Sequence, residues 1–153
     1  MSTRSNIGII NQDGTVEVIY CHWDGYPSFN GALLLNHYKD EAKVRKLLQL
    51  GDISTLAENP EPAAGAEHNF DNPAEHVVVA YMRDRGEKDL QARHIDSLDE
   101  YLALVRNDVF IEFVYLFNAA TGTWQWMPNF DDGSGCRDLR LLKDSDVVAP
   151  QAA

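Results

Sequence analysis

The segment that most constrains the fold is a β-hairpin signature near the start of the chain. An apolar run at residues 7–10 is followed by the sequence NQDG, and a second run, rich in β-branched residues, covers 15–23. The Asp-Gly pair supplies the positive φ angles that a tight turn between two strands requires. Alternate residues of a strand share one face, so Tyr20 and His22 are predicted to lie on the same side.

Two helices are predicted after the hairpin. Ser28 can cap a helix over residues 29–38. A second helix starts at about Asp40, where apolar side chains recur at helical spacing, and Gly51 stands where a C-terminal cap belongs. This spacing predicts a helical hairpin that packs on the sheet.

The second half of the chain combines a long loop with further strands and one helix. Residues 57–76 contain three prolines and show no helical or strand period, which predicts a mobile surface loop. Ser97 and Glu100 form a capping-box pattern in front of a third helix. Strands are expected at 77–84, 90–95, 110–117 and 124–127, with a short segment at 137–142 and a frayed tail at about 144–153.

The order of these elements predicts an α+β domain. Strands follow one another along the chain instead of alternating with helices, which favours a mostly antiparallel sheet of about five to six strands. We expect a single domain over residues 1–153, in which the helical hairpin and the third helix cover the sheet. The hairpin at 7–23 and the strand at 110–117 are predicted to lie in one antiparallel sheet.

Charge and cysteine content exclude several classes of protein. The chain carries 13 basic and 24 acidic side chains, and 12 of the acidic ones lie in residues 51–100. Nucleic-acid phosphates and anionic lipids repel such a chain, so we expect no direct nucleic-acid partner and no membrane contact. No apolar run reaches the ~18–20 residues of a membrane span. Cys21 and Cys136 lack the CxxC spacing, which indicates reduced thiols in a cytosol.

Reactive side chains are densest where the second strand runs into a loop, in the string YCHWDGYP. Neighbours in a strand point to opposite faces, so Cys21 and His22 cannot form a nucleophile pair. His22, Asp24 and His37 are of the types that bind zinc or iron, but their spacing defines no ligand set. We therefore expect no metal.

Two interpretations of this string stay open. In the first, the aromatic side chains belong to the core and His22 bonds to a loop carbonyl. In the second, Trp23 and Tyr26 form the flat apolar walls of a binding pocket, while Asp24 and His22 offer hydrogen bonds. The second interpretation requires further polar groups from elsewhere in the chain.

Two groups of arginines can complete such a pocket. Arg4 and Ser5 precede the first strand, and Arg83 and Arg85 follow the apolar run at 77–82. Guanidinium groups and hydroxyls at strand ends suit phosphate or carboxylate recognition, although Arg83 and Arg85 can instead pair with neighbouring acids. We expect one concave ligand-binding site, with no catalytic residue and no cofactor, formed by Arg4, Ser5, His22, Trp23, Asp24, Tyr26, Arg83 and Arg85.

Several stretches of the chain are motif-like: STRSxIG at 2–8, YCHWDGYP at 20–27, HY at 37–38, GDIS at 51–54, RDRGE at 83–87 and FVYLF at 113–117. Together they resemble a family of small proteins that tailed bacteriophages and prophages encode, and the string at 20–27 is the specific one. The chain departs from the family pattern after Pro27, where Ser28 replaces the expected glycine or valine. The resemblance implies a phage accessory protein and no particular mechanism.

An aromatic and arginine cluster without a catalytic motif favours binding over chemistry. We expect a non-enzymatic protein of the host cytoplasm that captures a small anionic, nucleotide-like ligand or a host protein, and by analogy counters a host defence. One alternative is a small enzyme that acts on such a molecule with His22 and Asp24 as acid and base. A second alternative is an acidic inhibitor of a host DNA-binding protein.

Overall fold

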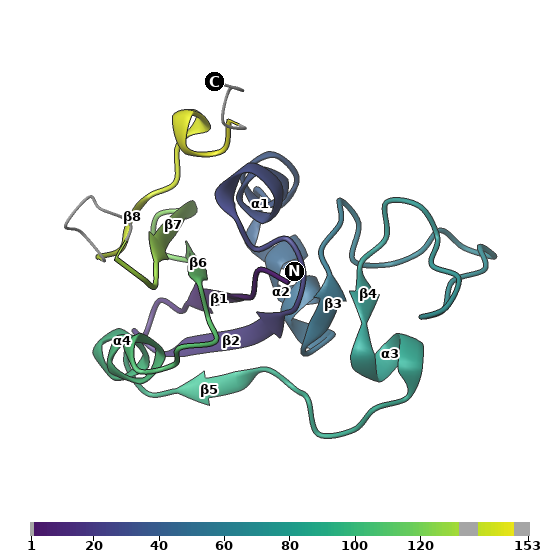
Figure 1. Ribbon diagram of the computed structural model, residues 1–153, viewed down its shortest axis with the longest axis horizontal. Coiled ribbons are helices and arrows are strands. Elements are labelled where there is room, and N and C mark those ends of the chain that lie inside the picture. The colour runs from purple at the N-terminus through teal and green to yellow at the C-terminus, as the bar shows by residue number, and fades with distance from the viewer. Residues whose placement is uncertain (1, 132–137, 149–153) are drawn as a thin grey trace.

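One mixed β-sheet forms the centre of the molecule (Figure 1). The computed structural model describes residues 2–131 and 138–148. Seven strands lie in the order β4, β3, β2, β1, β6, β7, β8, and β5 pairs with the first half of β2. The strands are β1 (Ser5–Ile10), β2 (Val16–Cys21), β3 (Ile53–Thr55), β4 (Val79–Ala80), β5 (Arg93–Ile95), β6 (Phe113–Asn118), β7 (Thr123–Pro128) and β8 (Arg140–Leu141).

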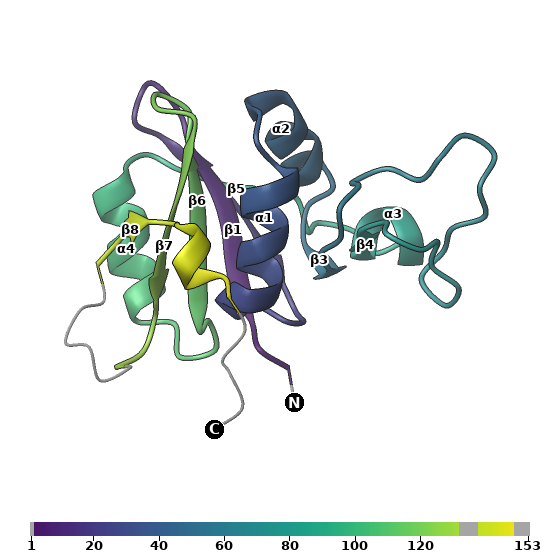
Figure 2. The same cartoon turned by 90° about the horizontal axis from the view of Figure 1, so that it is seen from above.

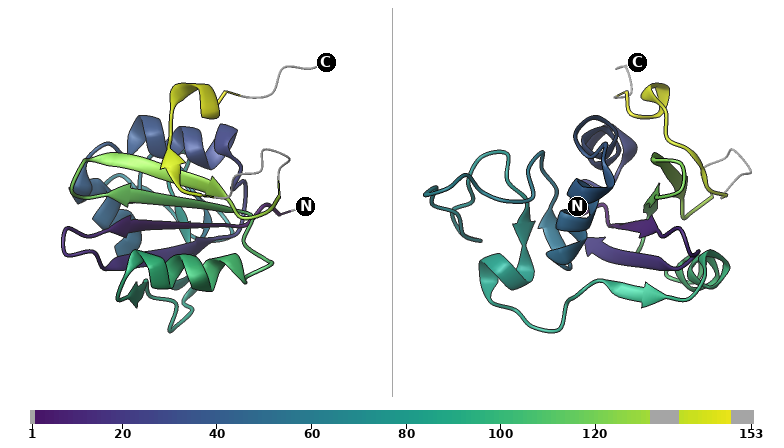
Figure 3. Two further views of the ribbon diagram at one scale, coloured as in Figure 1. Left: turned by 90° about the vertical axis from the view of Figure 1, so that its left-hand side faces the viewer. Right: turned by 180° about the vertical axis from the view of Figure 1, so that it is seen from behind.

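Helical segments cover both faces of this sheet. Helices α1 and α2 pack on one face and α4 packs on the other, while α3 lies at the β4 end (Figures 2 and 3). The segments are the π-helical turn η1 (Pro27–Gly31), α1 (Ala32–His37), α2 (Glu41–Gln49), α3 (Tyr81–Arg85), α4 (Leu98–Arg106) and the 3-10 turn η2 (Asp144–Asp146). No helix among the described residues is both long enough and apolar enough to cross a membrane.

The predicted hairpin is confirmed. β1 and β2 pair antiparallel, with Ser5 opposite Cys21 and Ile10 opposite Val16. The turn between them contains Gly14 at a φ of +88°, a conformation that L side chains rarely adopt. The Asp-Gly signal therefore located the turn correctly.

The prediction of a mostly antiparallel sheet is wrong in part, because two strand pairs are parallel. β1 pairs parallel with β6, and β2 pairs parallel with β3. Parallel neighbours need a crossover connection, which is usually helical. The segment from η1 to α2 connects β2 to β3, and α4 connects β5 to β6. The sheet also has more strands than predicted.

The first helical region differs from its prediction. Ser28 does not cap it, because the helix begins one residue earlier with Pro27 in the first turn, where the missing N–H is no loss. α1 and α2 are separated by Tyr38, which has non-helical φ and ψ angles of −119° and 65°. The two short helices form the crossover from β2 to β3 instead of the predicted helical hairpin.

The strand predicted at 77–84 is mostly absent. Only β4 pairs with β3, and the chain then turns into α3. The carboxylate of Asp84 accepts a hydrogen bond at 2.7 Å from the backbone N–H of Ala80, the residue that precedes this helix. In contrast, the predicted cap of α4 is confirmed, because the Ser97 hydroxyl accepts from the backbone N–H of Glu100 at 3.1 Å.

Two apolar clusters lie on opposite faces of the sheet. The larger packs under α1 and α2, and the smaller packs under α4. Alternation along the strands divides the side chains, so that Ile7 and Ile9 join the larger cluster while Val16 and Val18 join the smaller. Tyr101 is buried in the smaller cluster, as the apolar face of the third predicted helix required.

Residues 57–76 form a long segment that contains no helix or strand, as predicted. Its one described piece of regular pairing is an isolated β-bridge between Asn59 and Val77. The tail is ordered in part, since η2 is followed by Val147, which packs against the larger cluster. Residues 132–137, which include Cys136 and the first residue of the segment predicted at 137–142, and the tail end at 149–153 lie outside the described residues.

Candidate functional site

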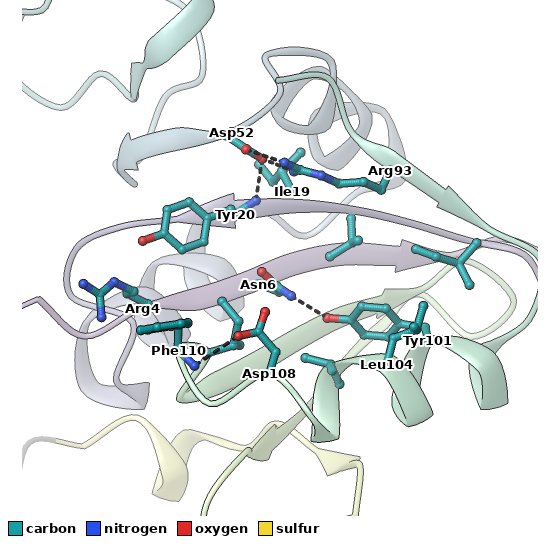
Figure 4. A pocket seen from close by; sticks show the side chains of 14 residues that line it. Arg4, Asn6, Ile19, Tyr20, Asp52, Arg93, Tyr101, Leu104, Asp108 and Phe110 are labelled. Atoms are coloured by element: carbon teal, nitrogen blue, oxygen red, sulfur yellow. Dashed lines mark hydrogen bonds and ion pairs between the residues drawn. The ribbon is translucent and has the colours of Figure 1, made fainter. Parts of the chain in front are cut away.

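A cavity of about 660 Å³ lies on the face of the sheet that α4 covers (Figure 4). β1 and β2 form its floor, β5 and α4 form its sides, and residues 108–111 lie at one end, where the Phe110 ring contacts Arg4. Its apolar lining consists of Val18, Ile19, Ile95, Leu104, Val105 and Ile111. A volume between about 300 and 1,000 Å³ with a mostly apolar lining is typical of small-molecule sites.

Two polar side chains stand on the floor. Asn6 and Tyr20 are cross-strand partners on β1 and β2, and both line the cavity. Asn6 lies on the same face of β1 as Ile10, and Tyr20 lies on the same face of β2 as Val18. Both polar residues lie beyond the part of this face that α4 covers. The alternation of the strands therefore places polar groups where the helix leaves the sheet uncovered.

The hydroxyl of Tyr101 forms the inner wall of the cavity. It accepts a hydrogen bond from the Asn6 side-chain amide at 3.0 Å. Tyr101 is buried in the smaller cluster, and this burial raises the pKa of its hydroxyl far above the usual range. The group therefore keeps its proton at neutral pH and acts as a hydrogen-bond donor.

An ion pair between buried Asp52 and half-exposed Arg93 forms the wall next to β5. The carboxylate of Asp52 accepts from both terminal nitrogens of the Arg93 guanidinium and from the backbone N–H of Tyr20 at 2.9 Å. The Asp52 side chain is 6% exposed. Hydrogen bonding to Asp52 raises the pKa of Arg93. Both charges are thus compensated within the protein, and this wall carries no net charge.

A cation without a carboxylate partner stands at the open end. The Arg4 guanidinium lies 5.8 Å from the ring centre of Phe110, whose side chain is 66% exposed. Arg4 forms no ion pair within the described ranges 2–131 and 138–148, in contrast to five other arginines. Those five are Arg45, Arg83, Arg85, Arg93 and Arg106.

Tyr20 connects this end to His22. The Tyr20 hydroxyl lies 2.7 Å from Nδ1 of His22. Burial, together with the positive charge of Arg4, lowers the pKa of His22, so the neutral imidazole is favoured. In the tautomer protonated at Nε2, neutral Nδ1 accepts the Tyr20 proton. The cluster therefore contains one permanent cation, Arg4, and two neutral polar groups.

Asn129 holds the end wall in place. Its side-chain amide donates to three backbone carbonyls, those of Val105 at 2.7 Å, Asp108 at 3.2 Å and Ile111 at 2.9 Å. One of these carbonyls, that of Val105, lies in the last turn of α4 and also accepts from the backbone N–H of Asp108 at 2.9 Å. This side chain thus fixes the segment that brings Asp108 and Phe110 to the cavity.

Some of the predicted site residues lie together. Arg4 and His22 are close enough for the charge of Arg4 to act on the imidazole, and the His22 ring contacts the Trp23 ring edge to face at 4.7 Å. The Trp23 side chain is 41% exposed, so it is not a core residue. Asp24 instead accepts from the Tyr26 hydroxyl at 3.3 Å. Tyr26 lies in a separate, shallower hollow beside Phe130.

The remaining predicted residues have other roles. Ser5 is fully buried on the opposite face, where its hydroxyl accepts from Asn30 at 3.3 Å. Arg83 donates to the carbonyls of Pro60 and Val78 and pairs with Asp84, so it ties the long loop to β4. With a further contact to His68, each of the three guanidinium nitrogens has a partner within the protein.

Arg85 is also engaged locally, because it pairs with Glu87 and lies over the rings of Phe70 and Tyr81. The alternative in which Arg83 and Arg85 pair with local acids therefore describes both arginines. No hydrogen bond or ion pair joins His22 to Asp24 in the described part of the chain. The same residues contain no group of three or more His, Cys, Asp or Glu side chains placed to hold a metal ion.

Sequence reasoning missed most of the cavity. Asn6 was a visible signal, since it is the one amide inside an otherwise apolar strand. Tyr101 carried no such signal, because an aromatic residue on the apolar face of a helix is ordinary core. The pairing of Asp52 with Arg93 joins residues 41 positions apart and had no local pattern.

A scan against protein-family models, a search of curated proteins and a search of solved structures each found no match.

Proposed function

We propose that this protein is a non-enzymatic binding protein that holds a small anionic, ring-bearing ligand in the cavity between β1, β2, β5 and α4. The observation that carries the proposal is the position of Arg4, a cation without a carboxylate partner among the described residues, at the mouth of a cavity of about 660 Å³. The origin of the protein in a bacteriophage and its place in the host cytoplasm stay predictions.

Electrostatics support an anionic group at this end of the cavity. The formal net charge of the chain is −11, so an anion is held only where a local cation outweighs the surrounding field. Asp52 and Arg93 compensate each other, which leaves Arg4 and the carboxylate of Asp108 as the other charged groups of the lining, and Arg4 is the cation without an ion pair among the described residues. A guanidinium group binds phosphate or carboxylate oxygens through two parallel hydrogen bonds.

The shape and lining support a flat ring as the body of the ligand. Phe110 and Tyr20 flank the mouth beside Arg4, and aliphatic side chains line the interior (Figure 4). Aromatic walls bind planar rings by stacking, and an arginine beside them suits a phosphate attached to such a ring. A nucleoside monophosphate has both parts.

The test uses isothermal titration of the full chain with the four common nucleoside 5′-monophosphates and with their nucleosides. We expect at least one nucleotide to bind about 10–100-fold more tightly than its nucleoside, which is the contribution of a charge-assisted hydrogen bond. Arg4→Gln should remove this difference. Arg106→Gln, which removes an exposed guanidinium paired with Asp138, is the matched control and should preserve it.

Two results would overturn the proposal. The first is an absence of binding by every nucleotide up to about 1 mM, which corresponds to roughly −4 kcal/mol. The second is unchanged binding by Arg4→Gln. Mass analysis of the recovered ligand addresses catalysis directly, because a binding protein returns the nucleotide unaltered and an enzyme does not.

A further inference from the structure

We propose that the ring of the ligand is of the guanine type, with two neighbouring N–H donors beside a carbonyl oxygen. This inference rests on the proposed function and concerns a second group of polar side chains in the same cavity. Three side chains from different elements meet there: Asn6 from β1, Tyr101 from α4 and Asp108 from the end wall (Figure 4).

Tyr101 supplies one donor that the protein itself does not use. Its hydroxyl oxygen accepts from the Asn6 amide, but within the described chain its own proton has no acceptor. The residue is only 3% exposed. Because an unsatisfied donor at such a depth is unfavourable, a buried hydroxyl is expected to find an acceptor, and this one lies on a cavity wall.

Asn6 and Asp108 supply two acceptors. The Asn6 amide donates through Nδ2, which leaves its Oδ1 without a donor among the described residues. Asp108 accepts from the backbone N–H of Phe110 at 3.0 Å through Oδ1 only. Its second oxygen is open to a ligand, since a carboxylate accepts about four hydrogen bonds.

The wall therefore displays two acceptors and one donor. A complementary ring has two donors and one acceptor along a single edge. Among the common nucleobases, guanine has this edge, formed by its amino group, its ring N–H and its carbonyl oxygen. Hypoxanthine lacks the amino donor, adenine has one donor beside one acceptor, and uracil has a single donor between two carbonyls.

Charge favours the same choice. Asp108 is an obligate acceptor when ionised, so it repels ring nitrogens and carbonyl oxygens that present lone pairs. A site with fixed polar groups rejects an analogue that lacks a matching group, because those groups are left unpaired. With its ring edge at this wall, a nucleotide directs its phosphate toward the open end, where Arg4 stands.

The experiment compares GMP, IMP and AMP by isothermal titration on the full chain. We expect GMP to bind about 10–100-fold more tightly than IMP, which differs from it by one amino group, and AMP to bind more weakly than both. Asp108→Asn keeps Oδ1 for the Phe110 N–H but replaces the open oxygen with a donor. In this variant the ratio between GMP and IMP should fall to near one.

The ratio of the GMP affinity to the IMP affinity is also independent of a general charge effect. The loss of a negative charge from the protein strengthens the binding of both nucleotides equally, because both carry the same phosphate. Asp138→Asn is the matched control, because Asp138 is exposed and is not a lining residue, and it should keep the wild-type ratio. Equal affinities for GMP and IMP in the wild type, together with a loss on Arg4→Gln, overturn this inference and leave the proposed function in place. Failure of all nucleotides to bind overturns both.

Discussion

Gly51 lies close to Leu90 and Met82, and this contact allows the energetic effect of packing to be separated from that of backbone conformation. Gly51 and Gly86 each stand just after a helix, and both have a φ of +74°. A Cβ on Gly86 would meet no atom within 4 Å. On Gly51 it would overlap the carbonyl oxygen of Leu90 and lie 2.6 Å from Cε of Met82. The two glycines are therefore a matched pair.

The expected effects follow from these surroundings. A left-handed conformation costs an L residue about 1–2 kcal/mol, and the stiffer unfolded chain offsets about 0.4–1 kcal/mol of this. Gly86→Ala should thus lower the free energy of unfolding by about 1 kcal/mol. Gly51→Ala adds the displacement of Leu90, whose carbonyl accepts from the Asp52 N–H at 2.9 Å. Overpacking of this kind costs about 1–3 kcal/mol more.

Urea unfolding of both variants, monitored by far-UV circular dichroism, measures this difference. The comparison assumes that the free energy of unfolding depends on the urea concentration with the same slope in both variants. We expect a midpoint for Gly51→Ala clearly below that of Gly86→Ala. Since Asp52 holds Arg93 at the cavity wall, ligand affinity should also fall in the first variant and not in the second. Equal loss of stability in the two variants would show that the contact with Leu90 is not there.

Three further changes have defined outcomes. Asn129→Asp should destabilise the fold by about 3 kcal/mol, because a carboxylate would face three carbonyls, whereas Asn107→Asp on the surface should cost less than about 1 kcal/mol in urea unfolding. Burial raises the pKa of Cys21 to about 11, so peptide-mapped alkylation at pH 8 should label it at least about 100-fold more slowly in the native than in the unfolded chain. The lowered pKa of His22 means that the unfolded state binds the imidazole proton more tightly than the folded state, so the free energy of unfolding should decrease as the pH falls below 6.5. His22→Gln should reduce this dependence of the free energy of unfolding on pH, and an unchanged dependence would contradict the reasoning.

Local patterns were sufficient for the elements whose partners are close in sequence. The Asp-Gly turn, the Ser97 cap and the apolar face of α4 depend on neighbours within a few residues, and all three are present. The parallel pairing of β1 with β6 joins segments more than a hundred residues apart and depends on where α4 crosses the sheet. No local pattern contains this information.

The candidate site likewise contains residues that a local pattern could predict and residues whose positions depend on contacts distant in sequence. Arg4 and His22 were predicted as site residues because each lies at a strand end, whereas Tyr20 was not among the predicted site residues. Arg83 was misplaced because the loop that it holds cannot be located from composition, and its carbonyl partner Pro60 lies 23 positions away. The contact of Asn6 with Tyr101 spans 95 positions and determines the inner wall of the cavity.

The central place of β1 in the sheet has a consequence for the chain as it is synthesised. One side of β1 pairs with β2 at once, but its other partner, β6, begins only at Phe113. Until then an apolar strand edge stays open, and such edges promote aggregation. α4 and residues 108–111 leave the ribosome just before β6, so the edge is closed and the cavity completed in one late step. A ligand in the cavity would therefore distinguish finished chains from truncated ones and would stabilise only the former.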